Sequence, residues 1–135
     1  MGKYENEHQL TTPNSKRALE RMRAICSRLP ETEEKIDGFG HTAFQVRGKS
    51  FVLMGENHED GTCNVSLKAS KTTQEILLQQ EGTAFFKTPY IGQHGWVSVR
   101  AEEATPWEEV ASVALEGYCL AAPKRLAAQV QSSAR

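Results

Sequence analysis

Residues 42–54, with the sequence TAFQVRGKSFVLM, decide the fold class of this chain. Phe44 and Val46 flank Gln45, which is the two-residue period of a strand that buries one face. Residues 47–50 are polar or glycine and precede an apolar run at 51–54, so the stretch predicts a β-hairpin. A second turn at 56–61 and alternating residues at 63–67 add a third strand. We therefore expect a three-stranded antiparallel meander.

The segment before the meander predicts a helix followed by a loop. Apolar residues recur every three or four positions between residues 19 and 29, with Thr12 as the expected N-cap, Pro13 as the first helical residue and Pro30 as the stop. The acidic and glycine-rich stretch 31–41, ETEEKIDGFGH, predicts a loop rather than a strand or helix.

The segment after the meander alternates between helical and strand patterns. Thr105-Pro106-Trp107-Glu108 is a candidate capping box, in which Thr105 and Glu108 satisfy amides at the start of a helix. The other expected elements are a helix at 70–81 closed by Gly82, strands at 84–87 and 96–100, the continuation of the capped helix to about Gly117, and a short helix from Pro123. The order α-β-β-β-α-β-β-α-α predicts an α+β fold with helices packed on a mostly antiparallel sheet.

Size and composition set limits on the class of protein. A chain of 135 residues with 39% hydrophobic and 24% charged residues is sufficient for one domain, which we expect at residues 11–131 after a flexible tail at 1–10. No apolar run is long enough to span a membrane, and three distant cysteines without a CxxC pair favour the reducing cytoplasm. The net charge of -1 means that nucleic-acid binding would require a local basic patch.

The stretch 90–96, YIGQHGW, contains the strongest candidate for acid–base chemistry. His94 lies between two glycines, but no nucleophile motif or orienting carboxylate is near it in the sequence. Gly92 and Gly95 are the residues that a turn with positive φ would need, so we interpret the stretch as a shaped turn in a non-enzymatic protein. A metal site from His41, His58, His94 and Cys63 is not supported by their spacing, and no cofactor is expected.

Lys124 and Arg125 follow Pro123 at the start of a predicted helix. Cations are disfavoured at a helix N-terminus, so helix stability does not explain them there, whereas binding of a phosphate or carboxylate would. The alternative is that they pair with carboxylates of this chain, of which the candidates are Glu31, Glu33, Glu34 and Glu108.

Further basic residues lie at the predicted turns and strand ends. Arg47 and Lys49 bracket the hairpin turn, Lys68 ends the third strand, and Lys87 precedes the YIGQHGW stretch. They could reach phosphate oxygens, or they could be solvated like most surface charges. Tyr90 and Trp96 could stack on the bases of a single strand or pack against the protein.

Several short motifs together resemble the MmcQ/YjbR family of small bacterial proteins. They extend from about Leu29 to Leu126 and are Leu29-Pro30, Gly40-His41-x-x-Phe44, Gly48-Lys49-x-Phe51, Leu67-Lys68, Pro89-Tyr90-x-Gly92, His94-Gly95-Trp96-Val97 and Ala122-Pro123-Lys124-Arg125-Leu126. The resemblance implies an α+β fold similar to the type III secretion chaperones and DNA binding through a double-wing arrangement.

Three hypotheses about function follow. The first is a DNA-binding protein, monomeric or homodimeric, that contacts phosphates through Arg47, Lys49, Lys68, Lys87, Lys124 and Arg125, with Tyr90 and His94 adding stacking or hydrogen bonds. The second is a protein-interaction module that binds partner peptides, which a groove with scattered basic residues would favour. The third is a small-molecule-binding protein, which would require His41 and His94 to converge in one pocket.

Overall fold

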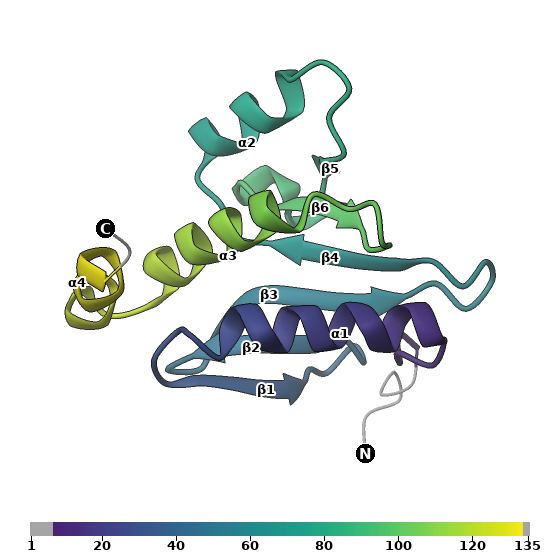
Figure 1. Ribbon diagram of the computed structural model, residues 1–135, viewed down its shortest axis with the longest axis horizontal. Helices are drawn as coiled ribbons and strands as arrows, with labels where there is room; N and C mark the ends of the chain where they lie inside the picture. Colours follow the sequence, from purple (N-terminus) through teal and green to yellow (C-terminus); the bar gives the residue numbers. More distant parts are fainter. Residues whose placement is uncertain (1–6, 134–135) are drawn as a thin grey trace.

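The computed structural model describes residues 7–133 and contains, within that range, four α-helices, six strands and one 3₁₀ helix (Figure 1). In chain order they are α1 (Pro13–Cys26), β1 (Thr32–Ile36), β2 (Thr42–Val46), β3 (Lys49–Glu56), β4 (Cys63–Leu67), α2 (Lys71–Gln79), β5 (Phe86–Lys87), η1 (Ile91–His94), β6 (Val97–Arg100), α3 (Trp107–Ala121) and α4 (Lys124–Ser133). The chain therefore has the α+β fold that the sequence predicts.

The strands form one antiparallel sheet in the order β1-β2-β3-β4-β6-β5. Five pairings share one end of this sheet: Thr32 with Val46, Val46 with Lys49, Val52 with Leu67, Leu67 with Val97, and Val97 with Lys87. The starts of β1, β3 and β6 thus lie beside the ends of β2, β4 and β5. We call this edge, residues 31–32, 46–49, 67–68, 87 and 96–97, the sheet end.

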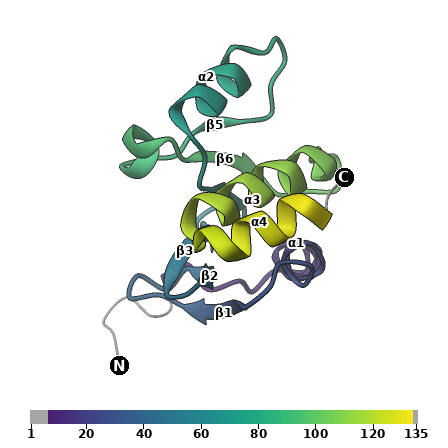
Figure 2. The same cartoon turned by 90° about the vertical axis from the view of Figure 1, so that its left-hand side faces the viewer.

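The hydrophobic core lies between the sheet and two helices. α1 and α3 cover the same face of the sheet, and α4 packs against α3 (Figures 1 and 2). Met22 of α1 and Tyr118 of α3 are fully buried against strand residues such as Phe51 and Val65. The ring of Tyr118 meets Phe51 edge-on at 5.5 Å, and its hydroxyl donates to the carbonyl oxygen of Pro30 at 2.7 Å. Tyr118 therefore links α3 to the start of β1.

β1 corrects the sequence-based prediction, which placed residues 32–36 in a loop. All five residues of Thr32–Ile36 pair with β2, and only residues 37–41 connect the two strands. β1 is an edge strand whose central residues Glu33, Glu34 and Lys35 are exposed, so it lacks the apolar alternation by which strands are recognised. Charged side chains are typical of an edge strand because they discourage pairing with other chains.

The start of α1 is fixed to the end of β3 by a buried carboxylate. Thr12 is the N-cap, as predicted, and its Oγ1 accepts a hydrogen bond from the Ser15 amide at 3.0 Å. Glu56, which is 3% exposed, accepts from the amides of Thr11 and Thr12 and from the Ser15 hydroxyl, at 2.6–3.0 Å. α1 ends at Cys26, four residues before Pro30.

Residues 1–6 of the predicted flexible tail lie outside the described residues. Within residues 7–10, the carbonyl of His8 accepts a hydrogen bond from the Glu56 amide at 3.1 Å. The His8 ring stacks on the His41 ring, with centroids 4.1 Å apart. Leu10 packs against the core.

The start of α3 differs from the predicted capping box. Thr105 Oγ1 donates to the carbonyl of Arg100 at 2.7 Å and accepts from the Glu102 amide at 2.8 Å, so it closes the loop after β6 and does not cap the helix. Pro106 occupies the N-cap position without a side-chain hydrogen bond. The helix also continues past Gly117 to Ala121. Gly117 does not end the helix; its missing side chain allows α3 to lie against the backbone of Lys68.

Candidate nucleic-acid interface

The β2–β3 turn places Arg47 and Lys49 at the sheet end. Val46 pairs with Lys49, so the turn has two central residues, Arg47 and Gly48, with φ of 49° and 80°. Positive φ at both positions is the geometry of a type I′ turn, which favours Asn, Asp or Gly. Arg47 therefore adopts a conformation that costs about 1 kcal/mol for a residue with a side chain. Both basic side chains are exposed.

Lys68 follows the last residue of β4 and lies beside the start of β6. Its ammonium is 5.8 Å from the ring centroid of Trp96, a distance at which a cation is attracted to the face of an aromatic ring. Trp96 is only 7% exposed, so of its two predicted roles the packing role is the one that the structure shows. Lys68 remains half-buried and reaches the surface over this ring.

The YIGQHGW stretch is a shaped connector from β5 to β6. Residues 91–94 form the 3₁₀ helix η1, and the Gln74 side chain of α2 donates to the carbonyls of Gly92 and Trp96 at 2.7 and 2.9 Å. Gly95 has φ of 102°, and a side chain there would overlap the carbonyl oxygen of Ala69. The predicted turn geometry is thus confirmed at Gly95. Gly92 instead has an ordinary φ. Glycine is needed there because the Lys87 side chain packs directly over this position and would overlap any side chain.

Three residues of this connector are exposed to solvent, Tyr90, Gln93 and His94, and two of them were predicted as contacts. Tyr90 is 94% exposed and has φ of 66°, an unfavourable backbone conformation for a residue with a side chain. His94 is exposed at the end of η1. Because the fold buries almost none of the Tyr90 ring, packing does not explain it, and the ring is available for stacking.

The N-terminus of α4 supplies Lys124 and Arg125, both exposed. Arg125 Nη2 lies 3.9 Å from Oε2 of Glu31, so the predicted pairing with a carboxylate of this chain is found for Arg125. The same carboxylate accepts from Arg47 Nε at 2.6 Å and from Nη2 at 3.3 Å. The hydrogen bond from Arg47 holds the pKa of the Glu31 carboxyl below its ordinary value, so Glu31 is ionised at neutral pH.

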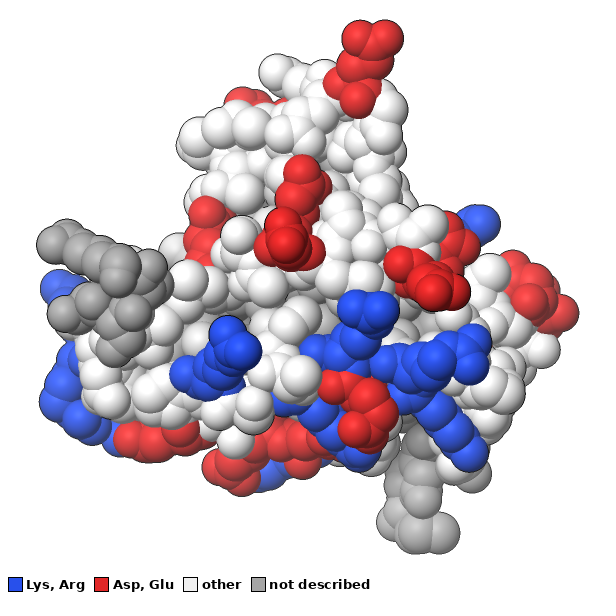
Figure 3. All heavy atoms as spheres, viewed as in Figure 1, with Lys and Arg blue, Asp and Glu red and all other residues white. Residues whose placement is uncertain are grey.

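The six basic residues predicted as phosphate contacts come from four separate chain segments and lie along or beside the sheet end. Figure 2 looks onto this end, and Figure 3 shows Lys and Arg side chains where Figure 1 places α4 and the β2–β3 turn. No ion pair within the described residues involves the four lysines of this set, which are Lys49, Lys68, Lys87 and Lys124. These cations are available to an external anion.

A comparison with protein-family models supports the resemblance noted in the sequence. The model of the YjbR family matches residues 27–120. The chain belongs to the YjbR family. The structure also resembles a crystal structure of the protein DR2400 from Deinococcus radiodurans, which has a DUF419 domain: the TM-score is 0.61, sequence identity is 21%, and the alignment covers 87% of this chain and 80% of that one. This similarity supports the fold alone. No curated protein matched the chain.

The YjbR-family chain has a second basic area on α1, which sequence analysis did not assign to a site. Figure 3 shows several Lys and Arg side chains over α1 with acidic side chains among them. Arg23 is bound to both Glu20 and Glu34, and Arg21 lies over the ring of Trp107. Part of the charge of this area is therefore already neutralised or covered.

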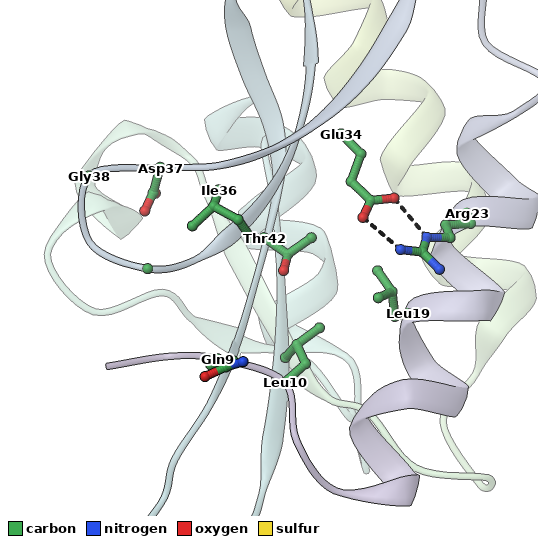
Figure 4. A pocket seen from close by; sticks show the side chains of 10 residues that line it. Gln9, Leu10, Leu19, Arg23, Glu34, Ile36, Asp37, Gly38 and Thr42 are labelled. Carbon is green, nitrogen blue, oxygen red and sulfur yellow. Dashed lines mark hydrogen bonds and ion pairs between the residues drawn. The ribbon is translucent and has the colours of Figure 1, made fainter. Parts of the chain in front are cut away.

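A groove of about 550 Å³ opens at the other end of β1 in this YjbR protein, between that strand, α1 and residues 9–10 (Figure 4). Leu10, Leu19 and Ile36 line it together with the Arg23–Glu34 ion pair, in which the nitrogen and oxygen are 2.7 Å apart. Ile36 is 60% exposed. This surface is the one that best fits the hypothesis of a protein partner.

The histidines do not form the pocket that the small-molecule hypothesis requires. His41 precedes β2 at the end of the sheet opposite to the sheet end, where it pairs with Asp37 at 3.2 Å, whereas His94 lies beside the sheet end. No group of three or more His, Cys, Asp or Glu residues in the range 7–133 is placed to hold a metal ion. In the same part of the YjbR chain, no helix is long and apolar enough to cross a bilayer.

Lys71 is a further basic residue beside the YjbR sheet end that sequence analysis missed. It is the first residue of α2 and directly follows Ser70, whose backbone lies against Gly95 of the connector. Its position at a helix start, like that of Lys124, was the available signal. Both are exposed lysines at helix N-termini near the predicted contacts.

Proposed function

We propose that this YjbR-family protein is a non-enzymatic nucleic-acid-binding protein that contacts phosphates along the sheet end. The observation that supports the proposal is that basic residues from four chain segments, exposed except for the half-buried Lys68, lie along one edge of the fold. Six strands spaced about 4.8 Å apart span about 24 Å, which is the rise of about seven base pairs. Such contacts would give affinity without reading a base sequence.

A salt titration tests this proposal. A protein with a net charge of -1 has no general attraction for DNA, so binding must depend on the local cations. We expect fluorescence anisotropy to detect binding of a labelled 20-nucleotide oligomer at 50 mM salt. At 200 mM salt the affinity should be about 50-fold lower for a single strand and about 150-fold lower for a duplex, as release of counterions from about four phosphates requires. Absence of binding at 50 mM for both single-stranded and duplex DNA would refute the proposal.

Tyr90 predicts a preference between single-stranded and duplex nucleic acid. Stacking of a base on an exposed aromatic ring contributes about 1–3 kcal/mol, and only an unpaired base offers its face. We expect Tyr90→Ala to weaken binding of single strands about five- to tenfold and that of a duplex less than twofold, as measured by anisotropy. Tyr90→Phe is the matched control and should retain the wild-type affinity. An equal loss for both strand forms would contradict a stacking role.

A second candidate function is the binding of a partner peptide in the groove between α1 and β1. It is favoured by the exposed side chain of Ile36 beside Leu10 and Leu19. We place it second because basic residues gathered around the YIGQHGW connector would favour nucleic acid. Lys68, Lys87 and Lys71 lie beside this connector and meet that criterion in part.

A further inference from the structure

One carboxylate lies between two guanidinium groups at the sheet end. Glu31 receives two hydrogen bonds from Arg47, at 2.6 and 3.3 Å, and Arg125 approaches the same carboxylate at 3.9 Å. The arginines come from the β2–β3 turn and from α4, which are far apart in sequence. Their convergence on one small anion is the arrangement by which arginines bind a phosphate group, whose oxygens match the guanidinium fork.

The backbone places Glu31 in this position. Thr32 pairs with Val46, so the next residues outward, Glu31 and Arg47, face each other across the strand pair. Tyr118 fixes the carbonyl of the preceding Pro30. Glu31 and Arg47 both have positive φ, 61° and 49°, although neither is Gly or Asn. Backbone preference explains neither residue type, and residues held in such conformations are concentrated at functional sites.

The ion pair is also exchangeable. The side chains of Arg47 and Glu31 are 50% and 43% exposed, and that of Arg125 is 69% exposed. An exposed pair is screened by water and salt and therefore contributes little to stability. A nucleic acid that also contacts Lys49 and Lys124 could displace one carboxylate, because its phosphates bind several cations at once.

We propose that Glu31 is an internal competitor for nucleic acid: its carboxylate occupies an anion site made by Arg47 and Arg125, and a backbone phosphate of the ligand replaces it. This inference rests on the proposed function. It assigns Glu31 a role as a negative regulator of affinity, and it identifies Arg47 and Arg125 as two halves of one phosphate site.

The test compares two variants with the same change in net charge. Glu31→Gln removes the competing charge and should tighten binding of the 20-nucleotide oligomer about three- to tenfold in anisotropy at 50 mM salt. Glu33→Gln is the matched control, because Glu33 lies two residues away on β1 and pairs instead with Lys35 at 3.6 Å. It should change affinity less than twofold. The double variant Glu31→Gln/Arg47→Gln should lose the gain.

The outcomes separate this inference from the proposed function. If wild type binds and Glu31→Gln gives no more than the effect of Glu33→Gln, Glu31 is not a competitor, while nucleic-acid binding stands. If neither wild type nor Glu31→Gln binds at low salt, the proposed function fails and the competitor with it. Thermal unfolding by circular dichroism should show both single variants folded, since each replaces an exposed side chain.

Discussion

The variant Lys49→Gln/Lys87→Gln/Lys124→Gln should bind a 20-nucleotide oligomer about 100-fold more weakly than wild type at 50 mM salt. Each cation that neutralises a phosphate releases about 0.7–0.9 counterion, so the loss of three contacts removes about two to three units from the slope of log K against log salt. Glutamine keeps most of each side-chain stem, including the part of Lys87 that covers Gly92. Anisotropy titrations at four salt concentrations measure both the affinity and the slope.

The control for this variant is Lys16→Gln/Arg17→Gln/Arg28→Gln, which removes three positive charges from α1 and the turn after it. All three residues are exposed and none of them forms an ion pair with another described residue. It should change affinity less than fivefold, through net charge alone. If the α1 variant loses binding and the sheet-end variant does not, the interface lies on α1.

Glu56→Gln should destabilise the fold by about 3–5 kcal/mol. The Glu56 carboxylate is buried and accepts four hydrogen bonds. The donors are the amides of Thr11 and Thr12 and the hydroxyls of Thr11 and Ser15. An amide side chain would turn an NH₂ group toward some of these donors, and each hydrogen bond to a buried charge contributes about 1.5–3 kcal/mol. Urea unfolding followed by circular dichroism measures the loss. Glu59→Gln, on the exposed β3–β4 turn, should change stability by less than about 0.5 kcal/mol.

The same carboxylate predicts acid sensitivity. Burial raises the pKa of Glu56, but the hydrogen bonds from Ser15, Thr11 and Thr12 outweigh it and lower the pKa to about 2. Since the folded pKa lies below the ordinary value of 4.5, this stabilisation is complete above about pH 4.5 and is lost as the pH falls toward 2. Between about pH 4.5 and pH 2, the free energy of unfolding of wild type should therefore fall by about 3 kcal/mol more than that of Glu56→Gln. Equal losses would show that Glu56 is not the group responsible.

Much of the fold could be predicted because β2 and β4 carry apolar residues at every second position and β3 contains a continuous apolar run at 51–54 between two turn signals. β1 could not, since its strand character comes from backbone pairing with β2 while Glu33, Glu34 and Lys35 face outward. Thr105 followed the pattern of a capping box, but its hydroxyl closes the preceding loop, a choice that depends on the position of the Arg100 carbonyl.

The candidate site was predictable only where it does not depend on β1, the strand that the sequence did not reveal. The turn residues Arg47 and Lys49 could be located from Gly48 and the flanking apolar runs. The contact between Glu31 and Arg47, in contrast, depends on the β1–β2 register, and that of Arg125 depends on how α4 packs on α3. The sequence indicated Glu31 only as one of several possible carboxylate partners, because spacing along the chain does not show which distant residues lie close together in the fold.

The location of the interface can be tested most directly by a ¹H–¹⁵N correlation NMR titration of the wild-type protein with a 12-nucleotide single strand at 50 mM salt. If the sheet end binds nucleic acid, the amides that shift most should belong to residues 31, 47–49, 68–71, 87–96 and 124–126. The amides of α1 and of residues 36–40 at the groove should stay in place. Shifts centred on α1 or on the groove, or none at any concentration of the oligomer, would contradict the assignment of this surface.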